Sequence, residues 1–289
     1  MKPYFLAAAS GLVLAACSGS DTAPAVDPEA ALETLTETEE APVEAESQGV
    51  KLYTFDCGTI EISDIGVFAS DGSYDGLSDT YADGCFAIVH PKGTLLWDLG
   101  LPGGLAGADP TTNGIFTVSL SRTLGDQLAD AGIDKIDYMA ISHLHFDHTG
   151  QPEAAGDAMW IVHEDELAAM QADTETDFSA FFAMDHMTFS GDHDVFGDGT
   201  VTILALPGHT PGHTSLLLKL DNAGPVMLTG DMYHRQESRD RKLVPQFNSD
   251  AEQSLESMAR FEELAGELGA RVIIQHSRAD LAALPQPLD

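Results

Sequence analysis

The sequence predicts an α/β fold in which two β-sheets are flanked by helices. Apolar, strand-like segments alternate with amphipathic helical segments along the chain. In several places a residue that can bind a metal follows directly after such a strand, which is where α/β folds place their chemistry. Residues 49–289 are long enough to bury the core of a single domain.

The first half of this domain is expected to consist mainly of strands. They are expected at three apolar segments, residues 51–55, 85–90 and 94–98. Residues 101–118 are rich in Gly, Pro and Thr and predict a loop beside the site that the ligands described below would form. Residues 124–131 have the apolar spacing of a helix, which Gly132 would end.

The second half repeats the alternation of strands and helices. Further strands are expected at residues 136–142, 159–163, 200–205 and 225–228, and in the apolar run that ends at His276. Helices are expected at residues 165–172 and from a capping box of Ser249 and Glu252 to Gly269. The aromatic stretch 174–199 would either wall a hydrophobic pocket or cover a sheet.

Three histidines and a carboxylate fall within residues 143–148. Imidazole and carboxylate are the donors that divalent metals such as zinc prefer. In an extended segment His143 and His145 point to the same side. Asp147 and His148 can then turn toward a second point about 3.5–4 Å away, the spacing of two-metal sites. The cluster therefore predicts a metal site rather than a run of surface polar residues.

Three later strands are each followed by another potential ligand. His209 and His213 follow the strand at 200–205, Asp231 follows the strand at 225–228, and His276 ends the last apolar run. Four adjacent donors cannot complete two metal coordination spheres, so ligands from elsewhere in the chain are needed. Four strand ends that converge on one point would form a metal site at a sheet edge.

These residues resemble the metallo-β-lactamase superfamily, whose members are metal-dependent hydrolases with an αβ/βα sandwich fold. The resemblance extends from residue 50 to the C-terminus. It rests on the pattern His-x-His-x-Asp-His at 143–148, followed by His, Asp and His in that order. Residues 95–100 also resemble the family's strand that ends in Asp-x-Gly, in which Asp98 would support a ligand histidine.

The resemblance implies a binuclear site for two divalent metal ions, which we expect to be zinc. One ion would take His143, His145 and His209, the other would take Asp147, His148 and His276, and Asp231 would bridge them. The family uses the first histidine of the segment 207–213, so His209 is preferred to His213 as the ligand.

Within the superfamily the chain looks most like the N-acyl-homoserine lactonase branch. The local matches are residues 142–148, residues 207–215 and the strand with Cys85. Asp231 at the bridging position argues against true β-lactamases, which usually have Cys or Ser there. Ribonuclease-Z-type nucleases need a basic surface, whereas this chain has a net charge of −34.

The resemblance implies a hydrolase that opens the lactone ring of a small-molecule substrate by means of a metal-bridging hydroxide, and the N-terminal segment described below indicates that it is exported. Asp147 would carry a proton to the leaving group. The lactonases place a carbonyl-facing Tyr three residues after the bridging Asp, whereas here Tyr233 stands two residues after Asp231 and His234 three after. Either of these side chains would orient the carbonyl oxygen.

Two other functions remain open at this point. A phosphotriester or arylester hydrolase of the methyl-parathion-hydrolase type would use the same metal ligands. A surface lipoprotein that binds metal without catalysis is the alternative from a different class. Nucleic acid is excluded as a substrate, because phosphate contacts need Lys and Arg and the chain has 13 of these against 47 Asp and Glu.

The N-terminus resembles a bacterial lipoprotein signal peptide, residues 1–17. Lys2 precedes an apolar run that is too short to span a bilayer and that ends at Cys17. We expect a lipid anchor at Cys17 and a location in the bacterial cell envelope, in the outer membrane facing the periplasm. Residues 18–48 are acidic and predict a disordered tether before the metallo-hydrolase domain, residues 49–289.

Two further cysteines, Cys57 and Cys85, lie in apolar, strand-like segments. An oxidising compartment would permit a disulfide between them. Two buried thiols are equally compatible with these surroundings. The oligomeric state cannot be derived from the sequence.

Overall fold

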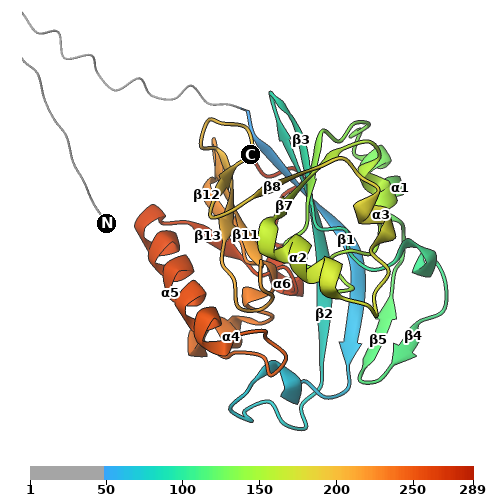
Figure 1. Cartoon of the computed structure of the whole chain (residues 1–289), viewed down its shortest axis with the longest axis vertical. Coiled ribbons are helices and arrows are strands. Elements are labelled where there is room, and N and C mark those ends of the chain that lie inside the picture. Colours follow the sequence, from blue (N-terminus) through green and yellow to red (C-terminus); the bar gives the residue numbers. More distant parts are fainter. Residues whose placement is uncertain (1–48) are drawn as a thin grey trace, which may run out of the picture. The chain divides into compact units, whose positions relative to one another are not determined.

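Two β-sheets pack against each other in the computed structural model, which describes residues 49–289 (Figure 1). The larger sheet has the strand order β4-β5-β1-β2-β3-β6-β7-β8, and the smaller has the order β13-β12-β11-β10-β9. The predictions for residues 1–17 and 18–48 lie outside the described residues. Between 49 and 289, no helix combines the length and the apolar character that crossing a bilayer requires.

The larger sheet is built on two long neighbouring strands. Its strands are β1 (Lys51–Ile62), β2 (Asp79–His90), β3 (Gly93–Trp97), β4 (Thr111–Asn113), β5 (Phe116–Ser119), β6 (Tyr138–Ala140), β7 (Met159–His163) and β8 (His186–Phe189). β4 and β5 correct the expectation of a loop at 101–118. β5 pairs antiparallel with the end of β1, because β1 extends well beyond the predicted residues 51–55 and offers an edge for pairing.

The smaller sheet is formed entirely by the second half of the chain. Its strands are β9 (His193–Asp194), β10 (Val201–Ala205), β11 (Thr214–Leu220), β12 (Gly224–Leu228) and β13 (Arg271–Ile273). Only β12 and β13 run parallel to each other within this sheet. β11 was not predicted; its run of leucines has no two-residue alternation, because nearly all of this central strand is buried.

Helices cover the outer side of each sheet (Figure 1). α1 (Leu124–Asp130), α2 (Glu164–Ala172) and α3 (Ser179–Phe182) cover the larger sheet, and α5 (Ala251–Leu268) covers the smaller one. Two short helices, α4 (Gln236–Arg241) and α6 (Arg278–Ala282), lie elsewhere, and Leu281 of α6 packs against the core between the sheets. α5 ends at Gly269 as predicted, but it begins one residue later than predicted. The Asp250 side chain, not that of Ser249, accepts the hydrogen bond of the helix cap, from the backbone N–H of Gln253.

The main core lies between the two sheets. It joins Ile88 and Trp97 of the larger sheet to Leu216 and Val226 of the smaller one, all of them fully buried. This αβ/βα sandwich is the predicted fold class, and it brings the ends of strands from both sheets to one edge.

A disulfide joins Cys57 of β1 to Cys85 of β2. Both cysteines are fully buried in the core between the larger sheet and its helices. The structure thereby decides between the two alternatives that the sequence left open.

Candidate metal centre and pocket

The potential ligands come from four segments that each follow a strand. Residues 143–148 follow β6, His209 follows β10, Asp231 follows β12 and His276 follows β13. β10, β12 and β13 belong to the smaller sheet and β6 belongs to the larger sheet, so the site lies where the two sheets meet. Each of these strands ends in buried or half-buried apolar residues, and the ligands follow in the loop after it.

The first group of donors contains three histidines. The Nε2 atom of His209 lies 3.2 Å from Nε2 of His143 and 3.1 Å from Nδ1 of His145. His143 Nε2 and His145 Nδ1 are 2.9 Å apart. Three ring nitrogens that all face one another cannot be satisfied by hydrogen bonds among themselves, whereas one divalent cation satisfies all of them. We call these three histidines the first half of the centre.

The second group contains Asp147, His148 and His276, and we call it the second half. Their donor atoms lie within 4.8 Å of one another. His276 Nε2 is 3.7 Å from Asp147 Oδ2. His148 Nε2 is fully buried and makes no hydrogen bond of good geometry among the described residues, and the nearest carboxylate oxygen is Oδ1 of Asp231 at 3.2 Å; a divalent cation would satisfy this nitrogen.

Asp231 lies between the two halves. Its Oδ2 atom is 3.5 Å from the Nε2 atoms of both His143 and His209. Its Oδ1 atom is 2.9 Å from Nε2 of His276 and 3.2 Å from Nε2 of His148. Each carboxylate oxygen therefore faces one half, which is the arrangement that a bridging ligand requires.

Three ligand histidines are oriented by a hydrogen bond from Nδ1, the ring nitrogen that faces away from the centre. His148 Nδ1 donates to Asp98 Oδ2 at 3.0 Å, His276 Nδ1 donates to the Ala82 carbonyl at 2.7 Å, and His209 Nδ1 donates to Asn248 Oδ1 at 2.9 Å. These bonds leave Nε2 of each ring free for a metal. Asp98 has the role that the sequence resemblance implied.

The surroundings keep the first half neutral. Burial lowers the pKa of His143 and of His209 well below the usual range. For His276, burial also opposes the charge, but the carboxylates of Asp231 and Asp147 outweigh it and raise the pKa to about 9. A neutral imidazole binds metal, and a site that attracts a proton also attracts a cation.

The structure brings together all seven predicted ligands, and it places His213 behind them. His213 Nδ1 donates to the Leu206 carbonyl at 3.0 Å, and its Nε2 accepts the backbone N–H of Asp231 at 3.0 Å. Burial lowers the pKa of His213 to about 4. The ring is therefore neutral at neutral pH, so its Nε2 can accept this hydrogen bond. His213 therefore orients Asp231, while His209 faces the centre.

His234 lines the pocket, but Tyr233 does not. His234 Nε2 lies 3.0 Å from Asp231 Oδ2, and its ring stacks on that of His276. Tyr233 is fully buried and packs against Phe261 of α5. The role predicted for Tyr233 is corrected on this ground: its backbone is extended, so neighbouring side chains point to opposite sides and only one can face the centre.

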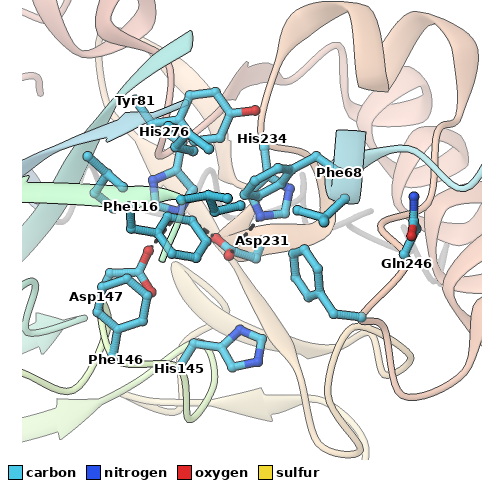
Figure 2. A pocket seen from close by; sticks show the side chains of 15 residues that line it. Phe68, Tyr81, Phe116, His145, Phe146, Asp147, Asp231, His234, Gln246 and His276 are labelled. Carbon is cyan, nitrogen blue, oxygen red and sulfur yellow. Dashed lines mark hydrogen bonds and ion pairs between the residues drawn. The ribbon is translucent and has the colours of Figure 1, made fainter. Parts of the chain in front are cut away.

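A pocket of ≈ 470 Å³ opens beside the centre (Figure 2). Its polar wall includes Asp147, Asp231, His234 and His276, and Figure 2 shows the rings of Phe68, Phe116 and Phe146 around them. The remaining wall is largely apolar, with Ile60, Ile62, Val67, Ile115 and Phe247. None of the lining residues is Lys or Arg.

The pocket wall was predicted only in part: residues 101–118 were expected beside the site, and Ile115 and Phe116 of this segment line the pocket. Residues 174–199 do not line it; Phe178 and Phe181 instead cover the larger sheet, the second of the two predicted alternatives. The wall comes from β1, from the segment after it and from β5. Within the ligand motif 143–148, the exposed aromatic residue Phe146 was a sequence signal for an apolar wall.

The family profile described as the Metallo-beta-lactamase superfamily matches residues 85–276, a segment that contains every predicted ligand. The chain belongs to the metallo-β-lactamase superfamily. It is accordingly a hydrolase of this metal-dependent superfamily, with an αβ/βα sandwich fold. The potential metal ligands are identified from the distances between side chains in this chain.

Several proteins similar to this chain are named N-acyl homoserine lactonases. An N-acyl homoserine lactonase AttM of Rhizobium radiobacter is 28% identical over 78% of this chain and 93% of its own length. The lactonase AttM of Azorhizobium caulinodans is 31% identical over 66% of this chain and 80% of its own length. A crystal structure of an N-acyl homoserine lactone hydrolase, with N-hexanoyl-L-homoserine bound at its catalytic metal centre, has a TM-score of 0.70 at 25% identity and covers 81% of this chain and 96% of its own.

Proposed function

We propose that the protein opens the lactone ring of N-acyl-homoserine lactones, with two divalent metal ions, expected to be zinc, at the centre. The observation that carries the proposal is the complete ligand set next to an apolar pocket without cationic side chains. Relatives and a structural neighbour of the same name support the substrate class.

The two halves would each hold one ion, with Asp231 between them. Bound divalent ions would supply a nucleophile derived from water at neutral pH and an electrophile for the carbonyl oxygen. Asp231 offers one oxygen to each half, so it would hold both ions. His213 fixes this position through the backbone N–H of Asp231.

The pocket suits an uncharged substrate with an aliphatic tail. An acyl-homoserine lactone has a polar ring and amide at one end and an alkyl chain at the other. The ring would lie against Asp147, His234 and His276, and the chain against Phe68 and Phe247. Each methylene that leaves water there contributes about 0.8 kcal/mol to binding.

Two pocket side chains have roles in the reaction on this proposal. Asp147 lines the pocket and lies at the second half, so its carboxylate can pass a proton to the alkoxide that leaves when the ring opens. His234 takes the place of the carbonyl-facing Tyr of the lactonases. Its ring lies between Asp231 and Phe68, where it can orient the carbonyl oxygen of the substrate.

The test is a hydrolysis panel with metal content measured on the same sample. Purified protein with zinc added should open N-acyl-homoserine lactones, followed by acid release in a pH-stat and by a mass increase of one water. An aryl phosphotriester and an arylester serve as competitors. Lactone opening no faster than in buffer, together with rapid cleavage of the phosphotriester, would assign the alternative function.

The proposal extends to export and a lipid anchor at Cys17. The motif at residues 14–17 supports it, and the Cys57–Cys85 disulfide fits an oxidising compartment. Mass spectrometry of the membrane fraction should find a mature chain that starts with an acylated Cys17. A soluble mature protein with a different first residue would contradict this part of the proposal.

A further inference from the structure

The carboxylate of Glu166 links two ligand-bearing loops. Glu166 lies in the first turn of α2 and is only 1% exposed. Its Oε1 accepts the backbone N–H of Leu144 at 2.7 Å. Its Oε2 accepts the Thr210 hydroxyl and the backbone N–H of Gly212, both at 2.8 Å. One buried side chain thus receives three hydrogen bonds from two separate segments.

Two of these three donors stand next to a histidine of the first half, and the third, Gly212, precedes His213. Leu144 lies between His143 and His145, and Thr210 directly follows His209. The three histidines come from segments far apart in the sequence, and their rings must keep distances near 3 Å for one ion to fit among them. Glu166 accepts a hydrogen bond from Leu144, which neighbours His143 and His145, and one from Thr210, which neighbours His209.

The close approach of the two loops to α2 is built into the sequence. A Cβ atom on Gly212 would overlap the backbone nitrogen of Glu166, so only glycine permits this contact. The position also has an electrostatic cost. Burial raises the pKa of Glu166 to about 7, against the opposing effect of the hydrogen bonds from Thr210, Gly212 and Leu144. A buried carboxylate is tolerated only where donors meet it, and here all three donors come from the two ligand-bearing loops.

The second half is held by other groups. Asp98 Oδ2 accepts from His148 at 3.0 Å and from Gln275 Nε2 at 2.7 Å, and His276 donates to the backbone of β2. None of these groups bonds to Glu166. The two halves therefore have different main supports, a carboxylate on α2 for the first and a carboxylate after β3 for the second. Ser142 connects them, because its Oγ atom lies 3.0 Å from His143 Nδ1 and 3.2 Å from His148 Nδ1, and Asp98 Oδ1 accepts its backbone N–H at 2.5 Å.

We propose that Glu166 is the positioning residue of the first half, which holds His143, His145 and His209 in register and so sets the affinity of this half for its ion. This inference rests on the proposed binuclear centre. Glu166 touches neither the ion nor the substrate; it acts through the loops. Outer partners of metal ligands typically change metal affinity by about 10–100-fold.

Glu166→Gln tests the inference, because it keeps the shape of the side chain but turns one acceptor into a donor that faces N–H or O–H groups. Metal-free protein is titrated with Co²⁺, followed by visible absorption and by calorimetry. We expect one of two Co²⁺ ions to bind about 10–100-fold more weakly and the other to be nearly unaffected. The thermal unfolding midpoint of the metal-free variant should stay close to that of the unchanged protein.

Two further variants make the result decisive. Glu164→Gln makes the same chemical change on the exposed side of the same helical turn, and it should leave both Co²⁺ affinities unchanged. Thr210→Val removes one of the three donors without changing the size of the side chain, and it should weaken the same ion as Glu166→Gln, by a smaller factor. If Glu166→Gln does not fold, Thr210→Val carries the test.

The inference is overturned if Glu166→Gln or Thr210→Val weakens both ions equally, or neither. A lower unfolding midpoint of the metal-free variant with unchanged relative affinities would also overturn it, because the role would then be structural only. The assay contains no substrate. Two Co²⁺ ions that bind to a protein without lactonase activity would refute the proposed substrate, while the result for Glu166 would stand.

Discussion

The two halves of the metal centre differ in the part of the fold that holds them. His148 and His276 of the second half are tied to strand β2 and to Asp98, directly after β3. The first half lies on loops, and its supports are Glu166 on α2 and Asn248 just before α5. The second half thus depends on the rigid sheets, whereas the first depends on side chains that connect loops to the outer helices.

The two halves also differ in charge and in access to the pocket. The second half contains the carboxylate of Asp147, and both Asp147 and His276 line the pocket. The first half contains three neutral histidines, of which only His145 lines the pocket. The comparison indicates that the second half faces the reacting end of the substrate, while the first half has mainly to keep its ion in place.

Asp231→Ala should have the largest effect, because it removes the one residue that both halves share. Both ions should bind more weakly, and the fall in turnover should exceed the roughly 10²–10⁴-fold value of general acid–base help. Elemental analysis and turnover on the same preparation provide the measurement. Full activity with only one bound ion would show that the halves are not coupled through Asp231.

Asp147→Asn should reduce turnover by roughly 10²–10⁴-fold, because the amide cannot pass a proton to the leaving alkoxide. We expect a smaller effect on the first half, whose ligands do not include Asp147. Metal content must be recorded beside the rate, to separate proton transfer from loss of an ion. Unchanged turnover with both ions bound would exclude Asp147 as the proton carrier.

Asp98→Asn should lower the metal affinity of the second half, whereas Glu166→Gln should lower that of the first. Asp98→Asn weakens the support of His148, so we expect about 10–100-fold lower affinity for the ion of the second half. The loss at the first half should be smaller, because Asp98 reaches His143 only through Ser142. Co²⁺ titrations of the two variants side by side give the measurement. If both variants weaken the same ion, the assignment of one support to each half fails.

Phe247→Ala should have the smallest effect and should leave both halves intact. Phe247 lies at the pocket wall and is 41% exposed, so its removal uncovers only part of an acyl chain. We expect kcat/KM for a long-chain lactone to fall about tenfold, with little change for a short-chain one. Equal losses for both chain lengths would place the acyl chain elsewhere.

The ligand residues of both halves could be predicted from the sequence, because the spacing within 143–148 and the strand before each later ligand are local features. The fold class followed from the same strands. The extra strands β4 and β5 could not be predicted, because they form only by pairing with the distant end of β1. The leucine-rich β11 was missed because a strand buried on both faces has no alternating pattern.

The side chains that hold the ligand loops, and the residues that line the pocket, could be identified only from the tertiary structure. Glu166 is one acidic residue among three in the first turn of α2, and nothing local distinguishes it from Glu164 and Asp165. Tyr233 and His234 are adjacent, and the extended backbone turns one to the core and the other to the centre. Side chains that stabilise a site by contacts across the fold leave no periodic or local pattern. The sequence by itself determined which residues can bind metal; the tertiary structure decided how they are held and what surrounds them.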